Sequence, residues 1–76
     1  MKDLVKAIVT PLVDYPGDID VREVDSENGS VIELRVKESD LGKVIGKQGR
    51  TAKAIRTILN AASVRSGKRV TLEIMD

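Results

Sequence analysis

The sequence predicts an α+β fold: a three-stranded mixed sheet with helices packed on one face, in the chain order αββααβ. Apolar residues recur at helical spacing over residues 2–13 and 50–64, and they alternate with period two over residues 31–37 and 70–75. Glycine-containing breaks separate these segments. With 76 residues, no Cys and no His, we expect one domain over residues 1–76 that is held together by packing alone.

The N-terminal segment predicts an amphipathic helix over residues 2–13. Its apolar side chains fall on one helical face: Leu4, Val5, Ile8, Val9 and Leu12. Pro11 is expected to tighten or end the last turn, because proline lacks a backbone N–H. Tyr15-Pro16-Gly17 then predicts a break, and we expect Tyr15 to be packed there as part of a hinge.

An antiparallel hairpin is expected over residues 19–37. Residues 19–24 begin a period-two alternation, and residues 31–37 place Ile32, Leu34 and Val36 on one face. Between them, Asn28-Gly29 favours a turn with positive φ.

Two helices and a last strand follow the hairpin. Ser39-Asp40 is a typical N-cap for a short helix over residues 41–45. The longer helix is expected to bury Ile55, Ile58, Leu59 and Ala62, with Ser63 on another face, and to end at Ser66-Gly67. The strand over residues 70–75 completes the sheet, and a right-handed crossover is expected if it runs parallel to residues 31–37.

Charge is distributed unevenly along a chain whose net charge is only +1. The segment from residue 41 to residue 72 contains eight basic residues and no acidic one, whereas the rest contains five basic and twelve acidic residues. The eight are Lys43, Lys47, Arg50, Lys53, Arg56, Arg65, Lys68 and Arg69. A solvated helix face usually mixes both signs, so this segregation predicts a cationic surface that binds a polyanion.

The strongest candidate site is the loop between the two helices, Gly46-Lys47-Gln48-Gly49. Glycine lets the backbone turn sharply and lets a ligand approach closely. The first N–H groups of the following helix have no internal partner, and the helix dipole adds positive potential there. Lys43, Lys47, Arg50 and Lys53 lie in or within about one turn of the loop. The pattern predicts binding of a phosphodiester backbone, although two glycines alone would only mark helix ends.

The segment Val44-Ile45-Gly46-Lys47-Gln48-Gly49 resembles the VIGxxG signature of KH domains. The element order resembles the bacterial, type II form of that fold, and nearly the whole chain is similar to the small stand-alone bacterial KH proteins of the KhpA family. One departure is Ala52, where many KH domains have Ile. Ala still fits a packed position there.

The resemblance implies a single-stranded RNA-binding protein. KH loops clamp the backbone of about four nucleotides while the bases enter an adjacent groove. By this likeness Gly46, Lys47, Gln48 and Gly49 hold the backbone, and Arg50 and Lys53 meet flanking phosphates. Lys43 is expected to be a further RNA-binding residue. Val44 and Ile45, with the strand near Ile32 and Leu34, are expected to form an apolar floor.

The resemblance also implies a cellular setting. It suggests an RNA chaperone or post-transcriptional regulator that works with a larger Jag-family KH protein, KhpB, in control of cell shape and cell-wall biogenesis. Self-association as a homodimer is a further implication. The chain shows no signal peptide and no apolar run long enough for a membrane span, so we expect a cytoplasmic protein with no membrane partner.

Other functions have weaker support in the sequence than RNA binding. Gly42 to Lys47 resembles a P-loop, but its spacing is one residue short and Gln48 replaces the Ser or Thr that holds Mg²⁺. Without His or Cys, and without an acid in the basic segment, the sequence favours neither an enzyme nor a cofactor or metal site. A protein-interaction module that does not need RNA stays open as the alternative.

Overall fold

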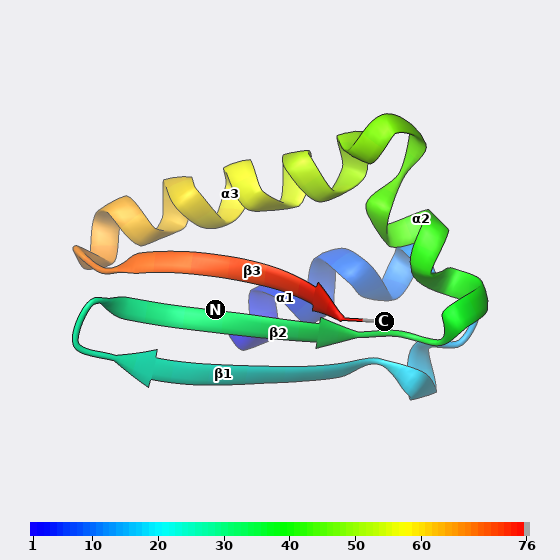
Figure 1. Ribbon diagram of the computed structural model, residues 1–76, viewed down its shortest axis with the longest axis horizontal. Coiled ribbons are helices and arrows are strands. Elements are labelled where there is room, and N and C mark those ends of the chain that lie inside the picture. The colour runs from blue at the N-terminus through cyan, green and yellow to red at the C-terminus, as the bar shows by residue number, and fades with distance from the viewer. Residues whose placement is uncertain (76) are drawn as a thin grey trace.

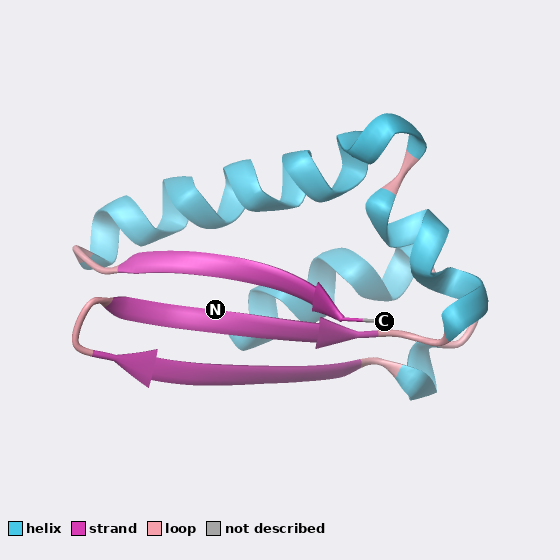
Figure 2. Cartoon of the chain, in the orientation of Figure 1, coloured by secondary structure: helices cyan, strands magenta, loops and turns pink. Residues whose placement is uncertain are grey.

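The computed structural model describes residues 1–75 and has the predicted αββααβ order (Figures 1 and 2). Short 3-10 turns lie at Thr10–Leu12, Pro16–Asp18, Glu38–Asp40 and Lys47–Gly49. None of the described helices is long and apolar enough to cross a membrane. The main elements are α1 (Lys2–Val9), β1 (Asp20–Ser26), β2 (Gly29–Arg35), α2 (Leu41–Ile45), α3 (Arg50–Ser66) and β3 (Arg69–Met75).

The sheet is three-stranded and mixed, as predicted. β2 lies in the centre, antiparallel to β1 with Val21 opposite Leu34, and parallel to β3 with Ile32 opposite Leu72. The chain reaches β3 from β2 by way of α2 and α3 (Figure 1). β1 and β3 are therefore the two edge strands, and β3 lies alongside α3 (Figure 1).

The helices pack on one face of this sheet, and the core lies between the helices and the sheet. Period-two alternation sends one set of side chains from each strand to that face. Burying each Val, Leu or Ile contributes roughly 1.5–3 kcal/mol relative to leaving it exposed. The core contains Val5, Val9, Val13, Val21, Ile32, Leu34, Val44, Ile55, Leu59, Val70 and Leu72.

Helix α3 buries a different set of residues from the one its apolar spacing predicted. Ile58 is 45% exposed, whereas Ser63 is buried together with Ile55 and Leu59. A polar residue is tolerated on the buried face because the Ser63 hydroxyl donates to the Asn60 carbonyl at 2.8 Å. The face toward the sheet is thus rotated from the predicted stripe, and Ile58 points away from the core.

The hairpin turn also differs in detail from the Asn-Gly prediction. Ser26 pairs with Gly29, so the turn residues are Glu27 and Asn28, and only Gly29 has a positive φ, at 140°. A Cβ at Gly29 would lie 2.0 Å from the carbonyl oxygen of Arg69. Glycine is needed here because the start of β3 approaches the backbone closely.

The segment between α1 and β1 confirms the role of Pro11 but corrects that of Tyr15. Helix α1 ends at Val9, and the 3-10 turn that follows contains Pro11. The predicted packing of Tyr15 in a hinge is wrong, because Tyr15 is 48% exposed. The Lys37 ammonium lies 4.0 Å from the centre of its ring, which is a cation–π contact at the surface.

Candidate nucleic-acid interface

The GKQG loop, residues Gly46 to Gly49, joins α2 to α3 through backbone conformations that L side chains rarely adopt. Gly46 has φ 78° and ψ 170°, Gln48 has φ 57° and Gly49 has φ 73°. A Cβ at Gly46 would lie 2.1 Å from the Thr51 hydroxyl oxygen, whereas a Cβ at Gly49 would meet nothing within 4 Å. Gly46 is therefore required by packing as well as by φ.

The loop presents backbone donors at its surface. The Gly46 N–H donates to the Gly42 carbonyl at 2.8 Å and the Gly49 N–H to the Gly46 carbonyl at 3.1 Å. Among residues 1–75, no hydrogen-bond acceptor is seen for the N–H groups of Lys47 and Gln48, and both side chains are exposed. These donors precede the 17-residue helix α3, whose dipole favours an anion at this end.

Four cations around the loop have no acidic partner. Within the described chain, Lys47, Arg50, Lys53 and Arg56 are exposed and form no ion pair. Arg50 makes only a hydrogen bond, at 3.3 Å, to the side-chain oxygen of Gln48. Their positive charge is available to an anionic ligand.

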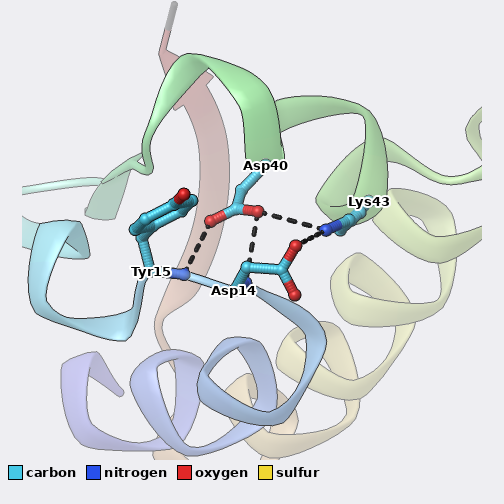
Figure 3. Close-up of polar contacts among 4 residues, drawn as sticks. All are labelled: Asp14, Tyr15, Asp40 and Lys43. Atoms are coloured by element: carbon cyan, nitrogen blue, oxygen red, sulfur yellow. Dashed lines mark hydrogen bonds and ion pairs between the residues drawn. The ribbon is translucent and has the colours of Figure 1, made fainter.

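Lys43 is placed differently from these four cations. Its ammonium is ion-paired with the Asp14 carboxylate and lies 3.4 Å from Asp40 Oδ1 (Figure 3). The hydrogen bond to Asp14 raises the pKa of Lys43; burial opposes this, and Asp40 adds to the rise. Lys43 therefore lies three residues before the loop, and its positive charge is already paired with the carboxylates of Asp14 and Asp40.

Asp40 stands at the N-cap position of α2, as the sequence predicted, but its side chain makes no capping hydrogen bond and is fully buried. Its carboxylate accepts hydrogen bonds from the backbone N–H groups of Asp14, at 3.2 Å, and Tyr15, at 3.0 Å, besides the Lys43 ammonium (Figure 3). No side-chain bond from Asp40 caps α2. We call Asp14, Tyr15, Asp40 and Lys43 the Asp40 cluster.

The electrostatics of Asp40 follow from these contacts. Burial raises the pKa of its carboxyl, but the two backbone N–H groups and Lys43 outweigh that effect and hold the pKa below its usual value. The buried carboxylate thus stays ionised and joins the α1–β1 connection to the start of α2. Sequence reasoning missed this role because the partners lie 25 and 26 residues away.

The predicted apolar floor lies mostly inside the core. Val44, Ile32 and Leu34 have 0% exposure, whereas Ile45 is 37% exposed. Val44 therefore supports the loop from below, and Ile45 is the residue of the predicted floor that reaches the surface.

A groove lies between α3 and the edge strand β3, not beside the central strand β2. Its volume is about 270 Å³. Arg56 and Arg69 bring positive charge to this groove. Both belong to the basic segment of the sequence, which predicted a cationic surface but not its position. We call it the α3–β3 groove; it is lined by Arg56, Leu59, Asn60, Arg69, Val70, Thr71 and Leu72.

Together, the αββααβ order, the mixed sheet and the glycine-flanked loop between two helices define a KH domain of type II topology. The family model described as "KhpA/KhpB, KH domain" matches residues 2–74. The chain belongs to this family.

Curated relatives agree with that assignment. The RNA-binding protein KhpA of Bacillus subtilis is 55% identical over 76 residues, which cover 100% of this chain and 94% of the relative. That of Clostridium perfringens is 52% identical over 75 residues, 99% of this chain and 100% of the relative. That of Aquifex aeolicus is 51% identical over 76 residues, 100% of this chain and 96% of the relative.

Proposed function

We propose that this chain binds single-stranded RNA, and that the GKQG loop grips the sugar–phosphate backbone. The observation that carries the proposal is that, within the described chain, the N–H groups of Lys47 and Gln48 have no hydrogen-bond acceptor and the cations beside them form no ion pair. Relatives over the same length are named RNA-binding proteins, which supports RNA as the ligand.

The proposal gives a task to each part of the surface. Phosphates meet the loop N–H groups and Lys47, while Arg50 and Lys53 neutralise flanking phosphates. Bases enter the α3–β3 groove, where Asn60 and Thr71 offer hydrogen-bonding groups and Arg56 offers a planar cation for stacking. The only aromatic residue, Tyr15, does not line this groove, so binding does not rest on aromatic stacking.

This geometry favours single strands over duplex RNA, because bases must be splayed out to enter the α3–β3 groove. Neutralising roughly 2–4 phosphates gives a log–log salt slope of about −1.5 to −3. Titrations of labelled single-stranded and duplex RNA at several salt concentrations test this. A slope near zero, or tighter binding of the duplex, contradicts the proposal.

The loop itself is tested by the double variant Lys47→Asp, Gln48→Asp. Both side chains are exposed, and exposed substitutions usually change stability by no more than about 0.5 kcal/mol. Acids at the start of α3 are compatible with the helix dipole, but they repel phosphate. We expect RNA binding to be lost while the thermal melt stays like that of the wild type.

The control is Lys2→Asp, which reverses an exposed charge on α1. It is expected to keep most of the RNA affinity. If the double variant melts like the wild type and binds RNA equally well, the loop is not the site.

We further propose a setting for this activity. The chain acts as one non-catalytic, cofactor-independent domain in the cytoplasm, as an RNA chaperone or post-transcriptional regulator that affects cell shape and cell-wall biogenesis. A Jag-family KH protein, KhpB, is its proposed partner; the family model covers the KH domains of both KhpA and KhpB, so the two chains share this fold. Sequencing RNA crosslinked to the protein in cells tests the regulatory role, and deletion of its gene tests the effect on cell shape.

Association with a second chain, either a homodimer or a complex with KhpB, is supported by two exposed apolar residues on α3. Ile58 is 45% exposed and Val64 is 79% exposed, and a small domain without covalent staples gains stability from a partner. Sedimentation and co-purification from cells test this. A strict monomer at high concentration with no co-purifying KH protein contradicts it. Full cellular function in the Lys47→Asp, Gln48→Asp variant would instead favour a protein-interaction module.

A further inference from the structure

The cations nearest the GKQG loop are not equivalent. Lys47, Arg50 and Lys53 have no carboxylate within ion-pairing distance among residues 1–75, whereas Lys43 contacts both Asp14 and Asp40. Lys43 precedes Gly46 by three residues and Lys47 by four. Helix α2 ends at Ile45, and a helix rises about 1.5 Å per residue, so the Lys43 backbone is roughly 5 Å from the first residue of the loop, within reach of a lysine side chain.

We propose that Asp14 sets the RNA affinity of the loop, because its carboxylate occupies the Lys43 ammonium and competes with an RNA phosphate for it. The loop then binds RNA more weakly than its full set of cations allows. This inference rests on the proposed RNA-binding function.

The two carboxylates that contact Lys43 differ in exposure, and this difference allows a phosphate to replace one of them. The Asp14 side chain is 69% exposed and that of Lys43 is 45% exposed, whereas Asp40 is fully buried. An exposed ion pair is weak and exchanges with other ions. An ammonium has three N–H donors, so Lys43 can keep its contact with Asp40 and exchange the Asp14 carboxylate for a phosphate oxygen.

The Asp14 carboxylate can be changed without changing the fold. The structural contribution of Asp14 to the Asp40 cluster is its backbone N–H, which donates to Asp40 Oδ1 at 3.2 Å. Its side chain points to Lys43 at the surface (Figure 3). Asp14→Asn therefore removes one charge and leaves that backbone hydrogen bond in place.

The experiment measures affinity for a fluorescently labelled single-stranded RNA of randomised sequence, with a thermal melt for every variant. The variants are Asp14→Asn, Lys43→Gln, both together, and the control Glu27→Gln. Glu27 is exposed in the β1–β2 turn, and that turn lies at the opposite end of the molecule from the α2–α3 loop (Figure 1). Its replacement changes net charge by the same amount, and a charge more than a Debye length away is largely screened at about 0.1 M salt.

We expect Asp14→Asn to tighten RNA binding about threefold to tenfold, as one added charge-assisted phosphate contact would. The salt slope should steepen by about 0.7, the value for one further phosphate on a single strand. In the Lys43→Gln background, the same substitution should change neither quantity.

Three results overturn the inference. The first is an equal change of RNA affinity in Asp14→Asn and Glu27→Gln. The second is tighter RNA binding by Asp14→Asn in the Lys43→Gln background. The third is weaker RNA binding by Asp14→Asn together with a lowered melting temperature. The wild-type titration separates the two proposals. If the wild type binds RNA and Asp14→Asn changes nothing, only the inference about Asp14 fails. If neither the wild type nor Asp14→Asn binds RNA, the proposed function fails and the inference fails with it.

Discussion

The two ends of α2 differ in whether their polar groups have hydrogen-bond partners. At its start, the Asp40 carboxylate is buried and meets two backbone N–H groups and a lysine. At its end, the N–H groups of Lys47 and Gln48 in the GKQG loop have no hydrogen-bond acceptor among residues 1–75. A helix of five residues is too short to be stable alone. The satisfied end therefore fixes the position of α2 on the α1–β1 connection, and the unsatisfied end is available to a ligand.

Asp40→Ala should have the largest effect on stability, because it removes the acceptor at the start of α2. It leaves the N–H groups of Asp14 and Tyr15 without their acceptor in a part-buried place, and an unsatisfied buried donor is costly. We expect the melting temperature to fall by at least about 10 °C, measured by circular dichroism. Ser39→Ala, an exposed neighbour, is the control, and an Asp40→Ala melt within a few degrees of it would contradict the anchoring role.

The two glycines of the loop should differ in what they tolerate. Gly46→Ala combines a Gly-only backbone conformation with a contact of 2.1 Å to Thr51, so a loss of about 2–3 kcal/mol or more is expected. Gly49→Ala meets open space and carries only the left-handed penalty, about 1–2 kcal/mol. Urea unfolding of both variants measures the difference. Equal losses would show that the contact with Thr51 is relieved at no cost.

The adjacent apolar residues Val44 and Ile45 at the end of α2 should differ in how much they contribute to stability and to RNA binding. Val44 is fully buried, whereas Ile45 is 37% exposed. Val44→Ala should lower the free energy of unfolding by about 1.5–3 kcal/mol. Ile45→Ala should cost clearly less and should weaken RNA binding if Ile45 contacts the bases. Unfolding and RNA titrations on the same samples provide both values, and a reversed order of stability would refute this assignment.

The smallest expected effect is the dependence of stability on acid pH. The pKa of Asp40 is lowered in the folded chain, so the unfolded chain binds the proton more readily. The contribution of Asp40 is fully present above the ordinary aspartate pKa of about 3.9 and is lost as pH falls through the folded pKa. Urea unfolding between neutral pH and about pH 2 should show a decline that is shallower in Asp40→Asn. Parallel curves would contradict the assignment.

Local sequence patterns were enough to predict the αββααβ order, the loop residues and the resemblance to KH domains. Helical spacing, strand alternation and Gly46 or Gly67 at helix ends act over a few residues, so they can be read along the chain. The same patterns misplaced Ile58 and Ser63, because which face of α3 is buried depends on where the sheet lies.

Only the tertiary structure decided the contacts that distinguish one polar residue from another. Asp40 looks like an N-cap until the backbone of Asp14 and Tyr15 is packed against it, and Lys43 looks like a phosphate ligand until Asp14 lies beside it. The groove beside β3 likewise appears once that strand takes the edge of the sheet. The physical reason is that these interactions join segments far apart in sequence. The packing of the whole core, rather than local spacing, brings such segments together.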